Sequence, residues 1–147
     1  MTKQNVEYEI ANGPGNTASP YGGGVLRIAR AKWDFAVDGG AISTITPGKD
    51  FNTLVPNDAI IVGGTVNATT AMVGTSGTLA IACGGITPLT ANAITALDVD
   101  DDVLNVTATF ASPLKTTAAG WITFAIATTA MTAGVVEVTL LYFVADA

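Results

Sequence analysis

Histidine is absent from this 147-residue chain, and cysteine occurs once, as Cys83. Without histidine, the Ser-His-Asp and Cys-His arrangements of many hydrolases cannot form, and the common zinc sites lose a main ligand. The four serines lack the spacing of a nucleophile elbow. A single cysteine excludes an internal disulfide, and no cation near Cys83 in sequence would activate its thiol. These absences predict a protein that is not an enzyme, with no catalytic residues and no cofactor.

Charged residues are also scarce, at 12% of the chain, and they sum to a net charge of -6. Binding of nucleic acid through its phosphates needs clustered lysine and arginine, so we expect no nucleic-acid partner. No phosphate-binding glycine loop followed by lysine occurs. So few charges over a whole domain predict that partner molecules cover part of its surface.

One long stretch without charge, residues 118–136, has the length of a membrane-spanning helix. Its large apolar side chains alternate, however, as Ile122, Phe124 and Ile126, and threonines and glycines interrupt it. This alternation is typical of strands, so two strands and no membrane partner are expected. The first residues, MTKQNVEYEIANG, also lack the apolar core of a signal peptide, which predicts that the chain is not exported.

Glycine, proline, asparagine and serine dominate residues 11–24, which predicts an extended N-terminal arm over residues 1–24 and a folded domain over residues 25–147. Within the arm, VEYEI alternates in the manner of a strand that adds to a neighbouring sheet. The candidate partner-binding residues of the arm are Val6, Tyr8, Ile10 and Tyr21.

From Val25 onward the pattern changes to short alternating segments. Ala29, Ala31 and Trp33 fall on one face of the first segment, which we extend through Val37, and charged residues fall on the other. Further strands are expected at residues 59–66, 78–83, 104–110, 121–128 and 135–144. The prediction is an all-β domain, a β-sandwich or jelly-roll-like fold, with at most one short helix, for which residues 88–103 show loosely helical spacing.

The dipeptide Asp38-Gly39 is typical of the type I′ turn of a two-residue hairpin. In that register Phe35 faces Ile42 and Trp33 faces Thr44. Asp38 then forms the turn, and Asp34 lies on the polar face of a strand. We therefore interpret these two aspartates as structural and not as a pair of catalytic carboxylates.

The densest acidic segment is DVDDD, residues 98–102. Asp98, Asp100 and Asp102 match the first three ligand positions of an EF-hand loop, but Val103 replaces the required glycine and Thr109 the final glutamate. We expect a solvated acidic loop and no metal, with a calcium site of another type as the alternative.

Three segments, AKWDFAVDGGAISTIT, LVPNDAIIVGGTVNATTAM and GTLAIACGG, resemble a group of small virion proteins of tailed bacteriophages. The resemblance covers residues 29–85, so the arm and residues 88–103 lie outside it. It implies a capsid decoration or cement protein with a β-sandwich core.

The expected function is therefore that of a structural phage protein that binds the outside of the capsid and stabilises or decorates it. The expected partners are the major capsid protein and other copies of the chain, as a trimer, since decorating proteins of this kind commonly occupy local threefold positions. The expected location is the capsid exterior of the virion, assembled in the host cytoplasm. The alternatives are a tail or head-fibre component that presents loops to a host surface, and a carbohydrate-binding module. The latter would need more exposed aromatic residues than ten Phe, Trp and Tyr supply.

Overall fold

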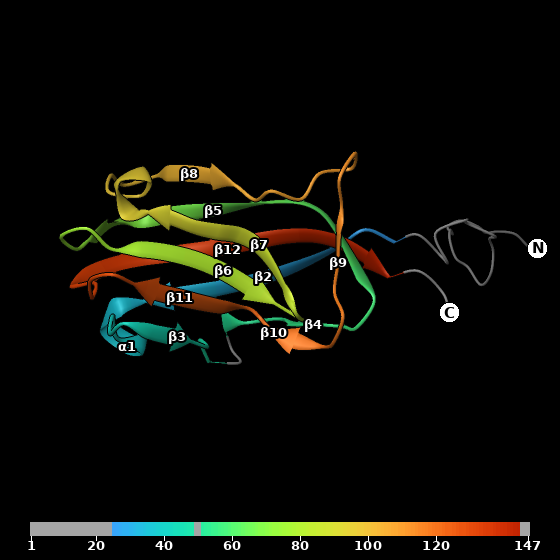
Figure 1. Ribbon diagram of the computed structural model, residues 1–147, viewed down its shortest axis with the longest axis horizontal. Coiled ribbons are helices and arrows are strands. Elements are labelled where there is room, and N and C mark those ends of the chain that lie inside the picture. The colour runs from blue at the N-terminus through green and yellow to red at the C-terminus, as the bar shows by residue number, and fades with distance from the viewer. Residues whose placement is uncertain (1–24, 49–50, 145–147) are drawn as a thin grey trace, which may run out of the picture.

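A computed structural model describes residues 25–48 and 51–144, and most of this part is β-structure (Figure 1). The larger sheet contains β2 (Arg27–Asp34), β5 (Ala59–Val73), β8 (Asp102–Asn105), β9 (Leu114–Lys115) and β12 (Ala133–Val144). It is antiparallel, with the order β2-β12-β5-β8, and β9 pairs with the start of β5. Strands β2 and β8 therefore form opposite edges of this sheet.

The second sheet contains β3 (Ser43–Ile45), β6 (Thr78–Cys83), β7 (Ile86–Ala93) and β11 (Thr123–Ala127), in the order β3-β11-β6-β7. A separate ribbon pairs β4 (Leu54–Val55) with β10 (Gly120–Trp121). Besides these strands, the described residues contain one turn of α-helix, α1 (Phe35–Asp38), and one 3-10 turn, η2 (Ile94–Ala96). The predicted all-β sandwich with at most one short helix is confirmed, whereas the predicted arm lies outside the described residues.

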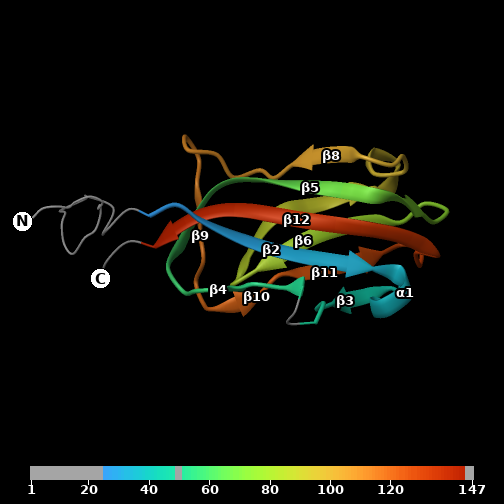
Figure 2. The same cartoon turned by 180° about the vertical axis from the view of Figure 1, so that it is seen from behind.

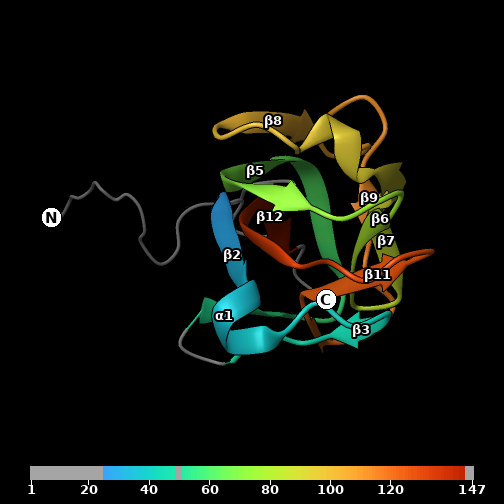
Figure 3. The ribbon, with the colours of Figure 1, turned by 90° about the vertical axis from the view of Figure 1, so that its left-hand side faces the viewer.

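Alternating side chains from both sheets fill one hydrophobic core. In the end-on view, β6 and β7 lie across from β2 (Figure 3). Along β12 every second residue is buried: Val136, Val138, Leu140 and Tyr142. Leu79, Ile81, Phe124 and Ile126 are the buried residues of β6 and β11. Burial of a branched or aromatic side chain stabilises the fold by about 1.5–3 kcal/mol, so this alternation fixes which face of each strand turns inward.

The strands predicted from alternation are present, with changed lengths. Residues 78–83 form β6 at the expected bounds, and residues 118–136 contribute β10, β11 and the start of β12, as the two-strand interpretation requires. The strand expected at 104–110 is instead β8, which ends at Asn105. No helix within the described residues is long and apolar enough to cross a membrane.

The hairpin predicted at Asp38-Gly39 is wrong. Strand β2 pairs with β12, and β3 pairs with β11, so Trp33 lies opposite Val136 and Thr44 opposite Ala125. The chain turns there through α1, and Gly39 ends the helix with a φ of 78°. Pairing with β12, whose inward side chains complete the core, stabilises β2 more than a local hairpin would.

The two aspartates of this segment hold α1 in place. The carboxylate of Asp34 accepts a hydrogen bond from the backbone N–H of Ala36 at 2.9 Å, and the carboxylate of Asp38 accepts one from the N–H of Asp34 at 2.9 Å. The indole N–H of Trp33 donates to the carbonyl of Gly39 at 2.8 Å, which ties the turn to the core. Both carboxylates therefore accept hydrogen bonds from backbone N–H groups, in agreement with a structural role.

Residues 88–103, expected to contain one helical turn or a short helix, contain the 3-10 turn η2, but the residues before it belong to strand β7. Pro88 lies inside β7, which is tolerated because β7 is an edge strand and proline lacks an N–H to donate. The carbonyl of Pro88 accepts hydrogen bonds from the N–H of Thr107 at 2.8 Å and from its hydroxyl at 3.1 Å.

Gly40 provides a test of how closely the α1 turn packs against the core. The N–H of Met131 donates to the carbonyl of Gly40 at 2.7 Å, and a Cβ at Gly40 would overlap the backbone of Met131. We expect Gly40→Ala to lower the free energy of unfolding by about 1–3 kcal/mol, measured by thermal or urea unfolding. Gly48→Ala is the matched control, because a Cβ there would meet nothing within 4 Å. Equal stability of the two variants would contradict the tight packing.

Candidate interaction surface

Two cations, Arg30 and Lys32, lie on the outer face of β2. Because Ala29, Ala31 and Trp33 point into the core, Arg30 and Lys32 point outward. Figure 2 shows β8 at the top of this sheet and β2 below β12. The guanidinium of Arg30 lies 3.6 Å from the carboxylate of Glu137 on β12, and both side chains are partly open to solvent. An ion pair as exposed as this adds less than about 1 kcal/mol of stability, so its charges remain available to a partner.

A short segment, residues 51–53, runs beside the free edge of β2. Asn52 forms an isolated antiparallel bridge with Ala31. The N–H of Thr53 donates to the carbonyl of Arg30 at 2.8 Å, and the N–H of Arg30 donates to the hydroxyl of Thr53 at 3.0 Å. The segment therefore satisfies the outward backbone groups of Arg30, and the middle of this edge cannot accept a further strand.

Asn52 anchors this segment to the second half of the chain. Its buried amide donates to the carbonyl of Ile122 at 2.8 Å, and its side-chain oxygen accepts from the N–H of Ile122 at 3.1 Å. Loss of a buried side chain that satisfies two backbone groups costs about 1–3 kcal/mol for each group left unsatisfied. Asn52 is thus a structural residue that places Phe51 and Thr53 next to β2.

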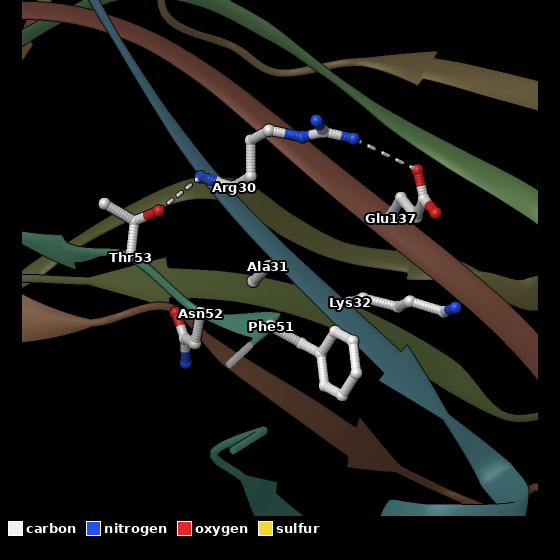
Figure 4. Close-up of a pocket in the computed structure, with 7 residues that line it drawn as sticks. All are labelled: Arg30, Ala31, Lys32, Phe51, Asn52, Thr53 and Glu137. Carbon is white, nitrogen blue, oxygen red and sulfur yellow. Dashed lines mark hydrogen bonds and ion pairs between the residues drawn. The ribbon is translucent and has the colours of Figure 1, made fainter. Parts of the chain in front are cut away.

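Between β2 and this segment lies an open hollow of about 460 Å³ (Figure 4). The residues that line it are Arg30, Ala31, Lys32, Phe51, Asn52, Thr53 and Glu137. The ammonium of Lys32 lies 5.7 Å from the centre of the Phe51 ring, within range of a cation–π interaction. The hollow combines two cations, one carboxylate and an aromatic ring. Aromatic residues and arginine are enriched in protein–protein interfaces, whereas lysine and glutamate are depleted there.

This surface contains no arrangement for covalent or acid–base catalysis. Histidine is absent from the sequence, and no hydroxyl or thiol nucleophile lies beside a base among the residues that line the hollow. Cys83 is buried on β6, and burial raises the pKa of its thiol to about 11, so the thiol stays protonated at neutral pH. Cys83 is therefore an inert core residue.

The acidic segment 98–102 forms the turn between η2 and β8. The carboxylate of Asp100 accepts from the N–H of Ala71 at 2.7 Å, and that of Asp102 accepts from the N–H of Val99 at 3.1 Å. Asp101 adopts a φ of 70°. Within the described residues, no group of three or more acidic, histidine or cysteine side chains is placed so that it could hold a metal ion.

The sequence-predicted sites thus lie apart. Asp38 and Gly39 end α1, the acidic turn lies next to β8, and the arm residues Val6, Tyr8, Ile10 and Tyr21 lie outside the described residues. The hollow beside β2 was missed, because Phe51 and Asn52 belong to a segment whose proline and glycine indicated only a connection. The outward alternation of Arg30 and Lys32 was the one available signal for it.

Comparison with known proteins identifies the fold. No protein-family model and no curated protein matches the chain. A chain of the cyanophage Pam1 capsid asymmetric unit is similar in structure, with a TM-score of 0.60, 18% identity, and coverage of 98% of this chain and 99% of that chain. A chain of the acid-stable capsid of Helicobacter pylori bacteriophage KHP30 has a TM-score of 0.56 and 13% identity, over 83% of this chain and 90% of that one.

A third similar chain comes from the capsid of Ralstonia phage GP4, with a TM-score of 0.52, 16% identity, and coverage of 90% and 93%. At these identities the likeness concerns the fold. The chain therefore shares its fold with chains of three phage capsid structures, in agreement with the resemblance to phage virion proteins.

The geometry of the acidic turn leads to a prediction about calcium binding. One carboxylate oxygen of Asp100 and one of Asp102 accept backbone N–H groups, which hold these side chains to the turn, and no group of three possible ligand side chains is found among the described residues. We expect the melting temperature to be the same in EDTA and in excess calcium, as followed by circular dichroism. A ligand that binds only the folded state raises the melting temperature, so a rise with calcium that EDTA reverses would contradict this prediction.

Proposed function

We propose that this chain is a non-enzymatic structural protein of a phage virion that binds the outside of the capsid and stabilises or decorates it. The observation that carries the proposal is the fold likeness over almost the full length of both chains to a chain of a phage capsid. A likeness that covers 98% of this chain and 99% of that chain favours, by analogy of fold, a role for the described domain in a virion.

The surface of the domain supports a role in assembly. Among the described residues, eleven large apolar side chains are exposed. Eight of them are at 54% or more of their full exposure: Val25, Ile28, Val37, Ile42, Phe51, Val99, Val103 and Phe110. With few charges between them, such side chains favour burial against other proteins. The proposed partners are the major capsid protein and other copies of the chain, with a trimer as the expected oligomer. Many copies on one shell add avidity to modest individual contacts.

The number of copies of this protein per virion tests where on the particle it is located. A protein that decorates the whole shell is present at a ratio near one to the major capsid protein, whereas a tail or head-fibre component is present in a few copies. We expect a ratio near one, measured by quantitative mass spectrometry of purified virions against isotope-labelled peptides. A tail protein of known copy number in the same sample is the internal control, and a few copies per virion would favour the tail or fibre alternative.

The arm is proposed as a second attachment to the capsid. Removal of residues 1–24 leaves the domain from Val25 onward intact, so we expect the truncated protein to keep its circular dichroism spectrum and melting temperature. We also expect it to lose co-sedimentation with capsids that lack the protein, because the alternating Val6, Tyr8 and Ile10 are removed.

Point variants in the full chain test whether capsid binding needs the particular residues of the arm and not only its length. The triple variant V6S/Y8S/I10S is expected to lose capsid binding as the truncation does, whereas N12S/N16S, in the same arm, is expected to bind normally. Unchanged binding by the triple variant, or loss of the fold on truncation, would contradict the role of the arm.

A further inference from the structure

The hollow beside β2 has an aromatic side and a charged side. Figure 4 shows Phe51 on one side of β2 and Glu137, which belongs to β12, on the other. Arg30 and Lys32 lie on the strand between them. The volume of the hollow, about 460 Å³, falls within the roughly 300–1,000 Å³ of small-molecule sites. The hollow therefore offers room to a small ligand with one apolar side and one polar side.

The charges around the hollow already compensate each other. Glu137 is ion-paired with Arg30 and is the cross-strand neighbour of Lys32, so a charged ligand would gain little. The ion pair is open to solvent, with 67% of the Arg30 side chain and 34% of the Glu137 side chain exposed. Its separation of 3.6 Å is longer than an N–H···O hydrogen bond. Both groups can therefore form hydrogen bonds with neutral hydroxyl groups, and such bonds are stronger than those between two neutral groups.

The aromatic side is a single ring whose backbone is fixed. Phe51 is 54% exposed, and its N–H donates to the carbonyl of Gly48 at 2.9 Å. The next residue, Asn52, is held by its two hydrogen bonds to Ile122. The face of an aromatic ring carries partial negative charge, so polarised C–H groups pack against it. Because the backbone that carries the ring is fixed before binding, less entropy is lost when a ligand binds.

We propose that this hollow binds one ring of a neutral sugar. A pyranose ring has the same two-sided character, because its C–H groups can pack on Phe51 while its hydroxyl groups reach Arg30 and Glu137. A guanidinium only donates hydrogen bonds and a carboxylate only accepts them, whereas a hydroxyl does both. Neighbouring hydroxyl groups of one sugar can therefore use both members of the ion pair. A specialised carbohydrate-binding module needs several exposed aromatic rings, but a site for one sugar needs only one.

Two other kinds of ligand fit this hollow less well. An extended peptide cannot pair with the middle of β2, because Thr53 already occupies the outward backbone groups of Arg30. A phosphate group would lie beside the carboxylate of Glu137, which repels it. A neutral ligand that both donates and accepts hydrogen bonds avoids both conflicts.

One open site of this size binds weakly, and we expect a dissociation constant on the order of 1 mM. Many copies on one shell would add avidity for a surface that carries sugars. That avidity rests on the proposed function, whereas binding by the isolated chain does not. Failure of the sugar test would therefore leave the copy-number result unaffected.

The test uses the full chain and saturation-transfer NMR with the methyl glycosides of glucose, galactose, mannose and N-acetylglucosamine. We expect transfer to at least one of them, strongest at the C–H protons that pack on the Phe51 ring. Titration gives the dissociation constant. Phe51→Ala is expected to weaken binding about tenfold, because the ring contact is lost, whereas Phe51→Tyr keeps the ring and binds normally. Glu137→Gln is expected to weaken binding about fivefold, because a neutral acceptor replaces a charged one.

Phe110→Ala is the matched control, because it removes a ring that is 74% exposed and does not line the hollow. Melting curves confirm that all variants are folded. No transfer to any of the neutral glycosides at about ten times the expected dissociation constant would overturn the proposal. Equal binding by Phe51→Ala and the unmodified chain would overturn it too, as would a loss in Phe110→Ala as large as that in Phe51→Ala. Preferential binding of glucuronate or inorganic phosphate would identify an anion site and would also contradict it.

Discussion

Strand β12 holds the larger sheet together, because it is the only link between β2 and the rest of that sheet. It pairs with β2 over eight residues, Asp34 to Arg27, and with β5 along its other side. Its inward residues, from Val136 to Tyr142, are buried one after another. Strands β2 and β12 lie near opposite ends of the described chain, so this sheet is complete only after long-range pairing, which makes folding slow compared with hairpin-based folds. The spacing between the two edges depends on the same strand.

Alternation along single strands was sufficient to predict much of the fold. It located β2, β6, β11 and β12, and it separated a run of nineteen uncharged residues into strands. Local turn signals were less reliable. Asp38-Gly39 has the composition of a hairpin turn, but a hairpin would have left β12 without β2 and Trp33 without its bond to Gly39. Where a local preference of about 1 kcal/mol opposes the burial of several large side chains, the burial decides the structure.

The candidate surface could be predicted only in part, because only some of its residues lie on a strand with an alternating pattern. Arg30 and Lys32 alternate with core residues, so their outward position follows from the sequence. Phe51 and Asn52 do not show such a pattern, and their position depends on the hydrogen bonds between Asn52 and Ile122, seventy residues later in the chain. The acidic turn was recognised as a cluster of charge. To predict that this turn lies at the sheet edge opposite β2, one would need the order of the strands in the sheet, which no local sequence pattern contains.

Because charged residues are scarce in this chain, the role of each one can be examined individually. Asp34, Asp38, Asp100 and Asp102 all accept backbone N–H groups, so a large share of the acidic residues serves to end or hold short turns. In a domain with many surface charges, two cations on the same face of a strand, as Arg30 and Lys32 are on β2, would be ordinary. Here Arg30 and Lys32 lie on either side of one carboxylate, since Glu137 on β12 is ion-paired with Arg30 and is the cross-strand neighbour of Lys32. The ring of Phe51 lies 5.7 Å from the ammonium of Lys32, so both cations already have partners within the fold.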